Sequence, residues 1–149
     1  MQAYVLTQEG PKLTQIDPPK PRPAEVLVRV RAAALNRVDL AMTRGHMHGG
    51  AGGVGAALGL EWAGEVVEAG PEVQGLVVVQ RVMGSGAGAF AEYTTADYGG
   101  VWPIPDAHMS FETAATLPVA LRTMHDAVVT NGALEPGQTV MINGASSGV

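Results

Sequence analysis

Glycine and proline interrupt the N-terminal part of this chain about every ten positions, and this spacing limits the folds that the chain can form. The sequence holds 20 Gly and 10 Pro in 149 residues. Short strands fit between such turns, whereas long helices do not. The clearest strand lies where Val26, Val28 and Val30 alternate with Arg29 and Arg31, because a period of two puts the valines on one face. The sequence therefore predicts a mostly β fold, a barrel or a sandwich.

The other strands are predicted from apolar runs between turn residues. A hairpin is expected around Gly10, and the proline-rich residues 17–23 should form an extended connection, because proline cannot donate to a central ladder. Residues 45–59 contain seven glycines and are expected to form a loop. The predicted strands are 3–7, 12–16, 26–32, 62–68, 76–83, 90–95 and 101–104.

Helical patterns occur once inside this region and again after Pro105. A short helix is predicted at residues 36–44, and a second helix can be capped by Ser110 with Glu112 in its first turn. This second helix is expected to be amphipathic and to end at residues 131–132. Its apolar stripe is Leu117, Ala120, Leu121, Met124 and Val128.

The last residues have the pattern of a strand that leads into a glycine turn. Residues 139–143 are apolar, and they are followed by Gly144, Ala145, Ser146, Ser147, Gly148 and Val149. In dinucleotide-binding domains such a turn precedes a helix whose N-terminal N–H groups bind the pyrophosphate. An ordinary β-turn is the alternative, because the glycine spacing alone is a weak signal. We therefore predict one domain over residues 1–137 and the start of a Rossmann cofactor domain at 138–149.

The composition argues against several classes of protein. The chain has 9 Lys and Arg against 14 Asp and Glu, a net charge of -5, and its basic residues are scattered. Nucleic acid is therefore not expected as a partner. The lack of cysteine excludes disulfides and thiolate zinc ligands. No signal-peptide pattern is present, and no apolar run reaches the roughly 18 residues that span a membrane, so we expect a cytoplasmic protein.

Five segments occur in an order that resembles the medium-chain dehydrogenase/reductase superfamily, in its zinc-free quinone oxidoreductase branch. They are Ala-Ala-Leu-Asn-Arg-Val-Asp at 33–39, Gly-Leu-Glu-Trp-Ala-Gly-Glu-Val-Val-Glu-Ala-Gly at 59–70, Arg-Val-Met-Gly at 81–84, Gly-Ala-Phe-Ala-Glu-Tyr at 88–93 and Leu-Glu-Pro-Gly-Gln-Thr-Val at 134–140. The resemblance implies a GroES-like, partly open antiparallel barrel followed by a Rossmann domain. It further implies NADP (NADPH) as the cofactor, hydride transfer to a quinone or enone substrate between the domains, and a homodimer when the protein is complete.

The resemblance also bears on metal binding. Zinc enzymes of this superfamily carry a cysteine where Asn36 stands and Gly-His-Glu where this chain has residues 59–61, Gly-Leu-Glu. Leu60 offers no donor atom, and catalytic zinc needs about three protein ligands. His46 and His48 lie two residues apart in the glycine loop and are expected to be solvated rather than to bind metal. We therefore predict no metal site.

The resemblance and the local pattern together single out Asn36, Asp39 and Thr123. The Asn36 amide could hydrogen-bond a carbonyl or the nicotinamide ribose, or Asn36 could be a helix N-cap. Asp39 could hold Asn36 or Arg44 in place, although a surface position in the first helical turn is the simpler reading. Thr123 corresponds to a threonine that contacts the nicotinamide in the family, with an ordinary helix-surface position as the alternative.

Some positions depart from the family. Met47 stands where many relatives place a tyrosine, which weakens a tyrosine-dependent enoyl reductase mechanism. Val79-Gln80 replaces a Gly-Asp turn, which suggests an altered local structure. His125 is expected to be partly packed rather than catalytic.

Two other functions stay open. One is a non-enzymatic binding or scaffold protein that keeps the fold, and the other is an alcohol dehydrogenase-like enzyme. Without the second wall of its cleft, the 149-residue chain alone is expected to be inactive.

Overall fold

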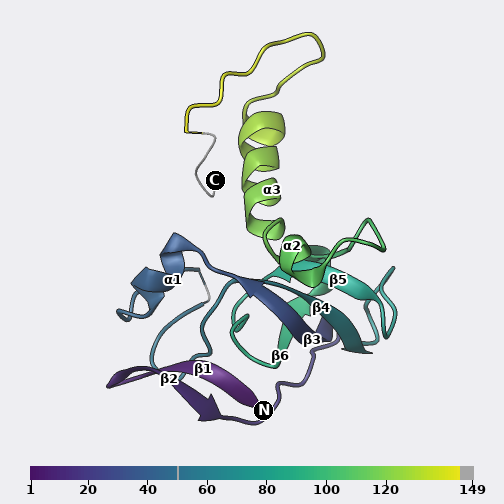
Figure 1. Cartoon of the computed structure of the whole chain (residues 1–149). Coiled ribbons are helices and arrows are strands. Elements are labelled where there is room, and N and C mark those ends of the chain that lie inside the picture. The colour runs from purple at the N-terminus through teal and green to yellow at the C-terminus, as the bar shows by residue number, and fades with distance from the viewer. Residues whose placement is uncertain (50, 145–149) are drawn as a thin grey trace.

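The computed structural model describes residues 1–49 and 51–144, and it shows a β-rich body from which one helix projects (Figure 1). A five-stranded antiparallel sheet has the order β6-β3-β4-β5-β7, while β1 and β2 form a separate hairpin. The strands are β1 (Gln2–Thr7), β2 (Gly10–Gln15), β3 (Glu25–Ala34), β4 (Glu61–Ala69), β5 (Arg81–Ser85), β6 (Tyr93–Asp97) and β7 (Val101–Pro103). The predicted mostly β, partly open antiparallel fold is therefore confirmed.

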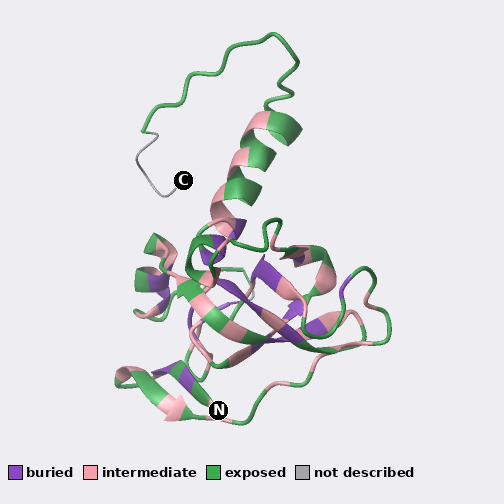
Figure 2. Ribbon diagram, turned by 45° about the vertical axis from the view of Figure 1, so that its right-hand side comes forward, coloured by how far each residue is buried: buried purple, intermediate pink, exposed green. Residues whose placement is uncertain are grey.

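The core lies against one face of this sheet. Val26 and Val28 on β3 are fully buried and Arg29 is exposed, as the alternation predicts. These valines pack in one cluster with Trp62, which is also fully buried. Gly64 lets β3 and β4 approach closely, because an added Cβ there would lie 2.1 Å from the Arg29 carbonyl oxygen. Figure 2 shows that buried residues concentrate in the sheet, whereas the projecting helix is mostly exposed.

The hairpin and the glycine loop close one side of the body. The Tyr4 N–H donates to the Phe90 carbonyl at 2.8 Å, and the Leu58 N–H donates to the Tyr4 carbonyl at 2.9 Å. Leu58 packs in a second buried cluster with Leu6 and with Met42 of α1 (Arg37–Met42). The loop predicted at residues 45–59 is therefore joined to the hairpin by a short ladder.

Two strands lie at different residues from those predicted. The strand predicted at 76–83 begins only at Arg81, because residues 77–80 form a turn in which Val79 has a φ of 65°. The Gln80 N–H donates to the Val77 carbonyl at 3.1 Å, which closes this turn. The strand predicted at 90–95 is shifted to Tyr93–Asp97, which pairs with β3. A short 3-10 helix, η1 (Tyr98–Gly100), then leads into β7.

The second predicted helix is two helices. The Ser110 side chain caps α2 (Phe111–Ala115) by accepting from the Thr113 N–H at 3.1 Å, as expected. The helix then breaks, because Pro118 lacks an N–H and takes the first position of α3 (Pro118–His125). Helical structure continues through the π-helical η2 (Asp126–Asn131) to the predicted end.

The segment after this helix is exposed. Residues 139–143, predicted as a strand, pair with no strand in the described part of the chain, and Met141 is 90% exposed. A strand needs a partner to form, so its assignment to a cofactor domain stays a prediction. Among residues 1–49 and 51–144, no helix is long and apolar enough to cross a membrane.

Candidate functional site

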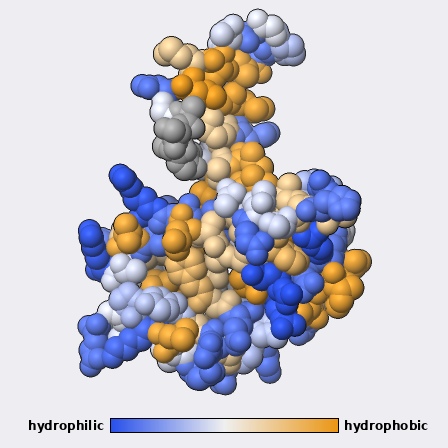
Figure 3. Space-filling model, viewed as in Figure 1, coloured by the Kyte–Doolittle hydropathy of each residue, from blue (hydrophilic) through white to orange (hydrophobic). Residues whose placement is uncertain are grey.

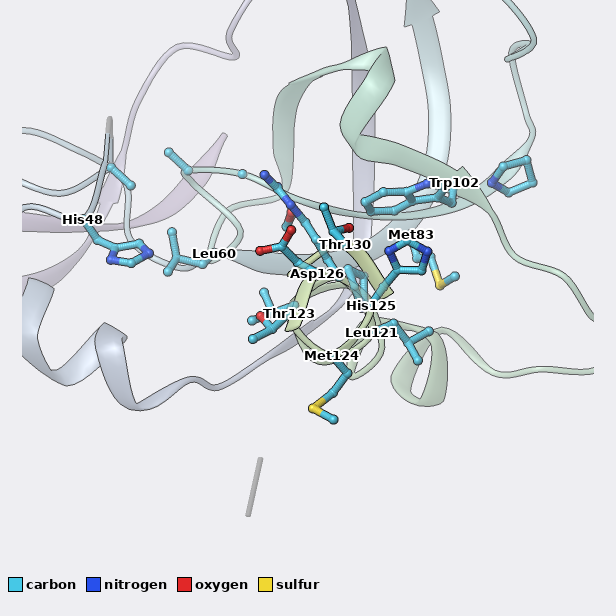
Figure 4. A pocket seen from close by; sticks show the side chains of 18 of the residues that line it. His48, Leu60, Met83, Trp102, Leu121, Thr123, Met124, His125, Asp126 and Thr130 are labelled. Carbon is cyan, nitrogen blue, oxygen red and sulfur yellow. The ribbon is translucent and has the colours of Figure 1, made fainter. Parts of the chain in front are cut away.

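A groove with a mainly apolar lining lies between α3 and the sheet, and Arg122, His125 and Asp126 also line it. Hydrophobic side chains gather along the projecting helix and on the body beneath it (Figure 3). In Figure 4, His48 and Leu60 lie at one end of the groove, Thr123 comes from the helix, and Trp102 lies toward the other end. Leu60, Met83, Trp102 and Leu121 provide most of the apolar lining that is labelled in that view. Such a groove suits a flat, uncharged molecule.

Asn36 stands at the N-cap position of α1 and is linked to the groove through a carboxylate. Its backbone has the extended conformation of a cap, which confirms the N-cap interpretation by position. The Asp39 N–H donates to the backbone carbonyl of Asn36 at 3.0 Å, and the two residues form a capping box. The Asn36 side chain also reaches β4, because its Nδ2 donates to Glu61 Oε2 at 3.0 Å. One amide hydrogen of Asn36 is therefore already used inside the protein.

Glu61 is a site residue that the sequence did not single out. Its side chain is 3% exposed at the start of β4, and its Oε1 accepts from the Val119 N–H at 2.8 Å. Val119 is the second residue of α3, where backbone N–H groups lack helical partners. Glu61 therefore connects Asn36 to the base of the helix that carries Thr123. Two sequence signals were available, because Glu61 matches the glutamate of the family's Gly-His-Glu segment and is a carboxylate next to apolar strand residues.

Asp39 is buried, so the simpler reading of a surface residue was wrong. It is 6% exposed, and its Oδ2 accepts from the Asn36 N–H at 2.6 Å. Its Oδ1 is buried without a hydrogen-bond partner in the described part of the chain. Burial raises the pKa of the Asp39 carboxyl, and the hydrogen bond from Asn36 opposes this with a smaller effect. Asp39 thus holds the backbone of Asn36, as the alternative role proposed.

Three further side chains line the groove or its rim from α3 and from the glycine loop. Thr123 is exposed and lines the groove, so the helix-surface and nicotinamide-contact interpretations are compatible. His48 is an exposed loop histidine, as predicted, but it also lines the groove. His125 is exposed, and the expectation that it is partly packed was wrong. The cause is that α3 projects from the body at that level (Figure 2).

The predicted pyrophosphate turn lies almost entirely outside the described residues. Gly144 is exposed and has a φ of 77°, a conformation that glycine adopts readily. Ala145, Ser146, Ser147, Gly148 and Val149 are outside the described part of the chain. Their role in cofactor binding stays a prediction.

The groove combines apolar side chains with a few polar ones. Within residues 1–49 and 51–144, no group of three or more His, Asp or Glu side chains could hold a metal. Asn36 is held in a capping box with Asp39, and its Nδ2 donates to Glu61 Oε2 at 3.0 Å. On the other side of Glu61, Val119 and Thr123 line the apolar groove.

Comparison with known proteins identifies relatives of this chain. Residues 22–106 match the model of the alcohol dehydrogenase GroES-like domain family. A polyketide synthase system protein of Streptomyces orinoci, NorB, is 39% identical over 127 residues, which is 85% of this chain and 6% of that protein. A phenolphthiocerol/phthiocerol polyketide synthase protein of Mycobacterium tuberculosis is 39% identical over 132 residues, with 87% of this chain and 6% of that protein covered.

Solved structures give a consistent result. An alcohol dehydrogenase superfamily protein from Novosphingobium aromaticivorans superposes with a TM-score of 0.90 at 31% identity, covering 99% of this chain and 47% of that one. The quinone oxidoreductase from Coxiella burnetii has a TM-score of 0.77 at 26% identity, covering 91% and 46%. The chain therefore spans about half the length of these structures and a small fraction of the polyketide synthase proteins.

Proposed function

The chain belongs to the medium-chain dehydrogenase/reductase superfamily, in its quinone oxidoreductase branch, and we propose that the protein containing it is a zinc-independent reductase that transfers hydride from NADPH to a quinone or another conjugated carbonyl. One observation carries the proposal. The groove is apolar, and at its end Leu60 stands where zinc-dependent relatives would place a ligand. The hydride acceptor must then be polarised by hydrogen bonds rather than by a metal.

The relatives support both substrate classes. Quinone oxidoreductases are among the structural neighbours, and the curated relatives with 39% identity are polyketide synthase proteins. Leu60, Met83 and Trp102 give the groove a surface that suits a flat ring or an unsaturated chain. NADPH rather than NADH is proposed from the family alone, because the residues that read the 2′-phosphate belong to the cofactor domain.

The residues of this chain would orient the reactants and supply a proton. A bound nicotinamide cofactor would supply the hydride, and an enone substrate would accept it at its β-carbon. Thr123 lines the groove from α3, and its hydroxyl can donate a hydrogen bond to the substrate carbonyl oxygen. The enolate that forms needs one proton at its α-carbon. His48 lies beside Leu60 at the end of the groove, and a ring nitrogen of its imidazole can donate a hydrogen to the substrate.

The test uses the complete protein that contains this chain. We expect it to oxidise NADPH in the presence of 1,4-benzoquinone or 2-methylcyclohex-2-enone, and to retain this activity after dialysis against a chelator. Loss of activity on chelation, with recovery on adding zinc, would instead identify an alcohol dehydrogenase-like enzyme. Failure to bind either NADPH or NADH at millimolar concentration would favour a non-enzymatic binding protein. We further propose a cytoplasmic homodimer, which light scattering and cell fractionation check.

A further inference from the structure

We propose that Trp102 determines substrate specificity, because it binds the apolar tail of the substrate at a subsite separate from the end of the groove where the carbonyl compound reacts. This inference rests on the proposed function, since it takes the Leu60 end of the groove as the place of hydride transfer. It narrows the substrate class from any conjugated carbonyl compound to enones that carry a flexible, uncharged chain.

The first support is the position of Trp102. It lies on the edge strand β7 directly opposite Met83 of β5, so the two side chains leave the same face of the sheet. Trp102 packs partly against the buried cluster that contains Met83, and it is itself only half-buried. It also lines the groove, together with Pro103 and Pro105. A half-buried tryptophan in a groove offers a large apolar surface to a ligand.

The second support is that α3 lines the groove with two different faces. Leu121 and His125 are four residues apart and share one face, whereas Thr123 lies two residues from each and points to the other side. In Figure 4, Thr123 lies toward Leu60, while Leu121 and His125 lie on the side of Trp102. The groove therefore bends around the base of α3, with the proposed reaction at one end and the indole at the other.

The third support is the floor between these two ends, which has only small side chains. The residues that line the groove there are Ser85, Gly86 and Ala87. This floor reaches the Leu60 end, because the Gly86 N–H donates to the Leu60 carbonyl at 2.8 Å. It reaches the other end as well, because the pair of Met83 and Trp102 lies only two residues before Ser85. A chain can thus lie along the floor from one end to the other.

The distance between the ends sets the length of that chain. Leu60 precedes β4 and Trp102 is on β7, with β5 between them, so two strand spacings of about 4.8 Å give about 10 Å. An extended chain advances about 1.2 Å per bond, so a tail of about eight carbon atoms spans this distance. A rigid ring system of that length cannot follow the bend, whereas a flexible chain can.

The lining of the far end also selects an uncharged tail. Leu121, Trp102 and the two prolines provide apolar surface there. Arg122 and Asp126 line the groove too, but both are exposed, so they can keep their water when the tail binds. These two charges are opposite in sign, so neither favours a charged tail. The ligand that fits both ends is therefore an enone with an unbranched hydrocarbon chain.

The test compares two enones with the same head group, in the complete protein with NADPH. Pent-3-en-2-one carries a methyl group on its β-carbon, and dodec-3-en-2-one carries an octyl chain. Each buried methylene is worth about fourfold, so the wild-type kcat/KM should be at least about fiftyfold higher for the long enone. Steady-state kinetics measure both values, with the long enone kept below the concentration at which it aggregates.

Substitutions then show whether Trp102 causes this preference. Trp102→Ala should lower the ratio of the two kcat/KM values about tenfold, and Trp102→Phe, which keeps an aromatic ring, should leave it within about threefold of wild type. Leu121→Ala should lower the ratio about threefold, and it should fold normally because Leu121 is 55% exposed. Leu13→Ala is the matched control and should leave the ratio unchanged, since Leu13 is 63% exposed on β2 and does not line the groove. Thermal unfolding checks the fold of each variant.

Three results would overturn the inference alone. They are a wild-type ratio near one, a folded Trp102→Ala variant that keeps the wild-type ratio, and reduction of 1,4-benzoquinone but of neither enone. If Trp102→Ala does not fold, Leu121→Ala decides in its place. If the wild-type protein reduces none of the three compounds, the proposed function fails and this inference fails with it.

Discussion

At the scale of single residues, Val79 is the most strained position in the described chain. Its φ of 65° lies in the left-handed region, which β-branched side chains rarely adopt. The turn that needs this conformation is closed by the Gln80 N–H, and the Gln80 side chain accepts from the Val77 N–H at 2.9 Å. Val79 is also 80% exposed, so its side chain gains little from burial. The relatives' glycine would relieve the strain, whereas valine does not.

We therefore expect Val79→Gly to stabilise the protein. Strain of this kind costs about 1–3 kcal/mol, while glycine costs about 0.5–1 kcal/mol in chain entropy, so the expected net gain is about 1 kcal/mol. Urea unfolding measures the change. Val79→Ala keeps a Cβ and serves as the control, with a smaller gain expected. A lower stability for the glycine variant would show that valine is not strained there.

Asp39 should make the stability depend on pH in a defined direction. Burial raises its pKa above the ordinary value of 3.8, so the folded protein keeps this proton to a higher pH than the unfolded chain. Protonated Asp39 contributes to the free energy of unfolding at pH values below its ordinary pKa. This contribution is lost as the pH rises through the raised pKa of the folded protein. We therefore expect the free energy of unfolding of Asp39→Asn to increase relative to that of the wild type as the pH rises through this range. Urea unfolding between about pH 3 and pH 7 checks this, and a difference that is constant with pH would contradict it.

His48 is expected to affect the proposed reaction at its protonation step. In the complete polypeptide, His48→Gln should lower kcat for 2-methylcyclohex-2-enone at least tenfold, because general acids contribute about 10²–10⁴-fold. His46→Gln is the control, since His46 lies in the same loop but does not line the groove. Steady-state kinetics with NADPH measure both. Equal rates for the two variants would remove His48 from the mechanism.

At the scale of elements, Arg81 joins β5 to the segment that precedes α2. Its guanidinium donates to the Ala107 carbonyl at 2.7 Å and to the Met109 carbonyl, and it lies 4.5 Å from the centre of the Phe111 ring. One planar fork therefore makes two hydrogen bonds and a stacking contact at once. Lysine cannot reproduce this arrangement.

We expect Arg81→Lys to lower the free energy of unfolding by about 1–2 kcal/mol, because it loses one hydrogen bond to a charged group and part of the stacking contact. Arg31→Lys is the matched control, since Arg31 lies 6.0 Å from the same ring, and it should change stability by less than about 0.5 kcal/mol. Urea unfolding compares the two. Similar losses of free energy in the two variants would mean that the contact with the Phe111 ring, rather than the two hydrogen bonds of Arg81, provides the stabilisation.

Local pattern predicted most strands but failed where tertiary contacts decide. β3 follows from alternation, and β4 follows from an apolar-rich segment between turn residues. Residues 76–80 also look like a strand, since Leu76 is followed by three valines. The turn there is set by pairing with β4, because the Val79 N–H donates to the Val66 carbonyl and the Val66 N–H donates to the Gln80 carbonyl. Sequence periodicity does not contain that information.

At the scale of the whole molecule, the family resemblance identified Asn36, Asp39 and Thr123, but not the contact that connects them. Glu61 is 25 residues from Asn36 and 58 from Val119 in sequence. Its role follows only when β4, α1 and α3 are brought together. For the same reason the burial of Asp39 was missed, since a carboxylate in a first helical turn is usually a surface residue.

The domain boundary can be tested directly. Residues 133–144 are exposed along their described length, so they contribute little to the body. We expect truncation after Gly137 to change the melting temperature by less than about 2 °C, since surface changes are usually within about 0.5 kcal/mol. Differential scanning calorimetry measures this. A much less stable or less soluble truncated form would place the boundary later than residue 137.

The attachment of the projecting helix has a mechanical consequence. Pro118–His125 and Asp126–Asn131 together form a rod of about 20 Å, and Glu61 holds it near its first turn. With such a lever, a tilt of about 5° at the fulcrum displaces the far end by nearly 2 Å, whereas Thr123 moves by less than half of that. Small adjustments at the buried carboxylate are thus amplified outward. A ligand that reaches along the helix would experience them more strongly with every turn.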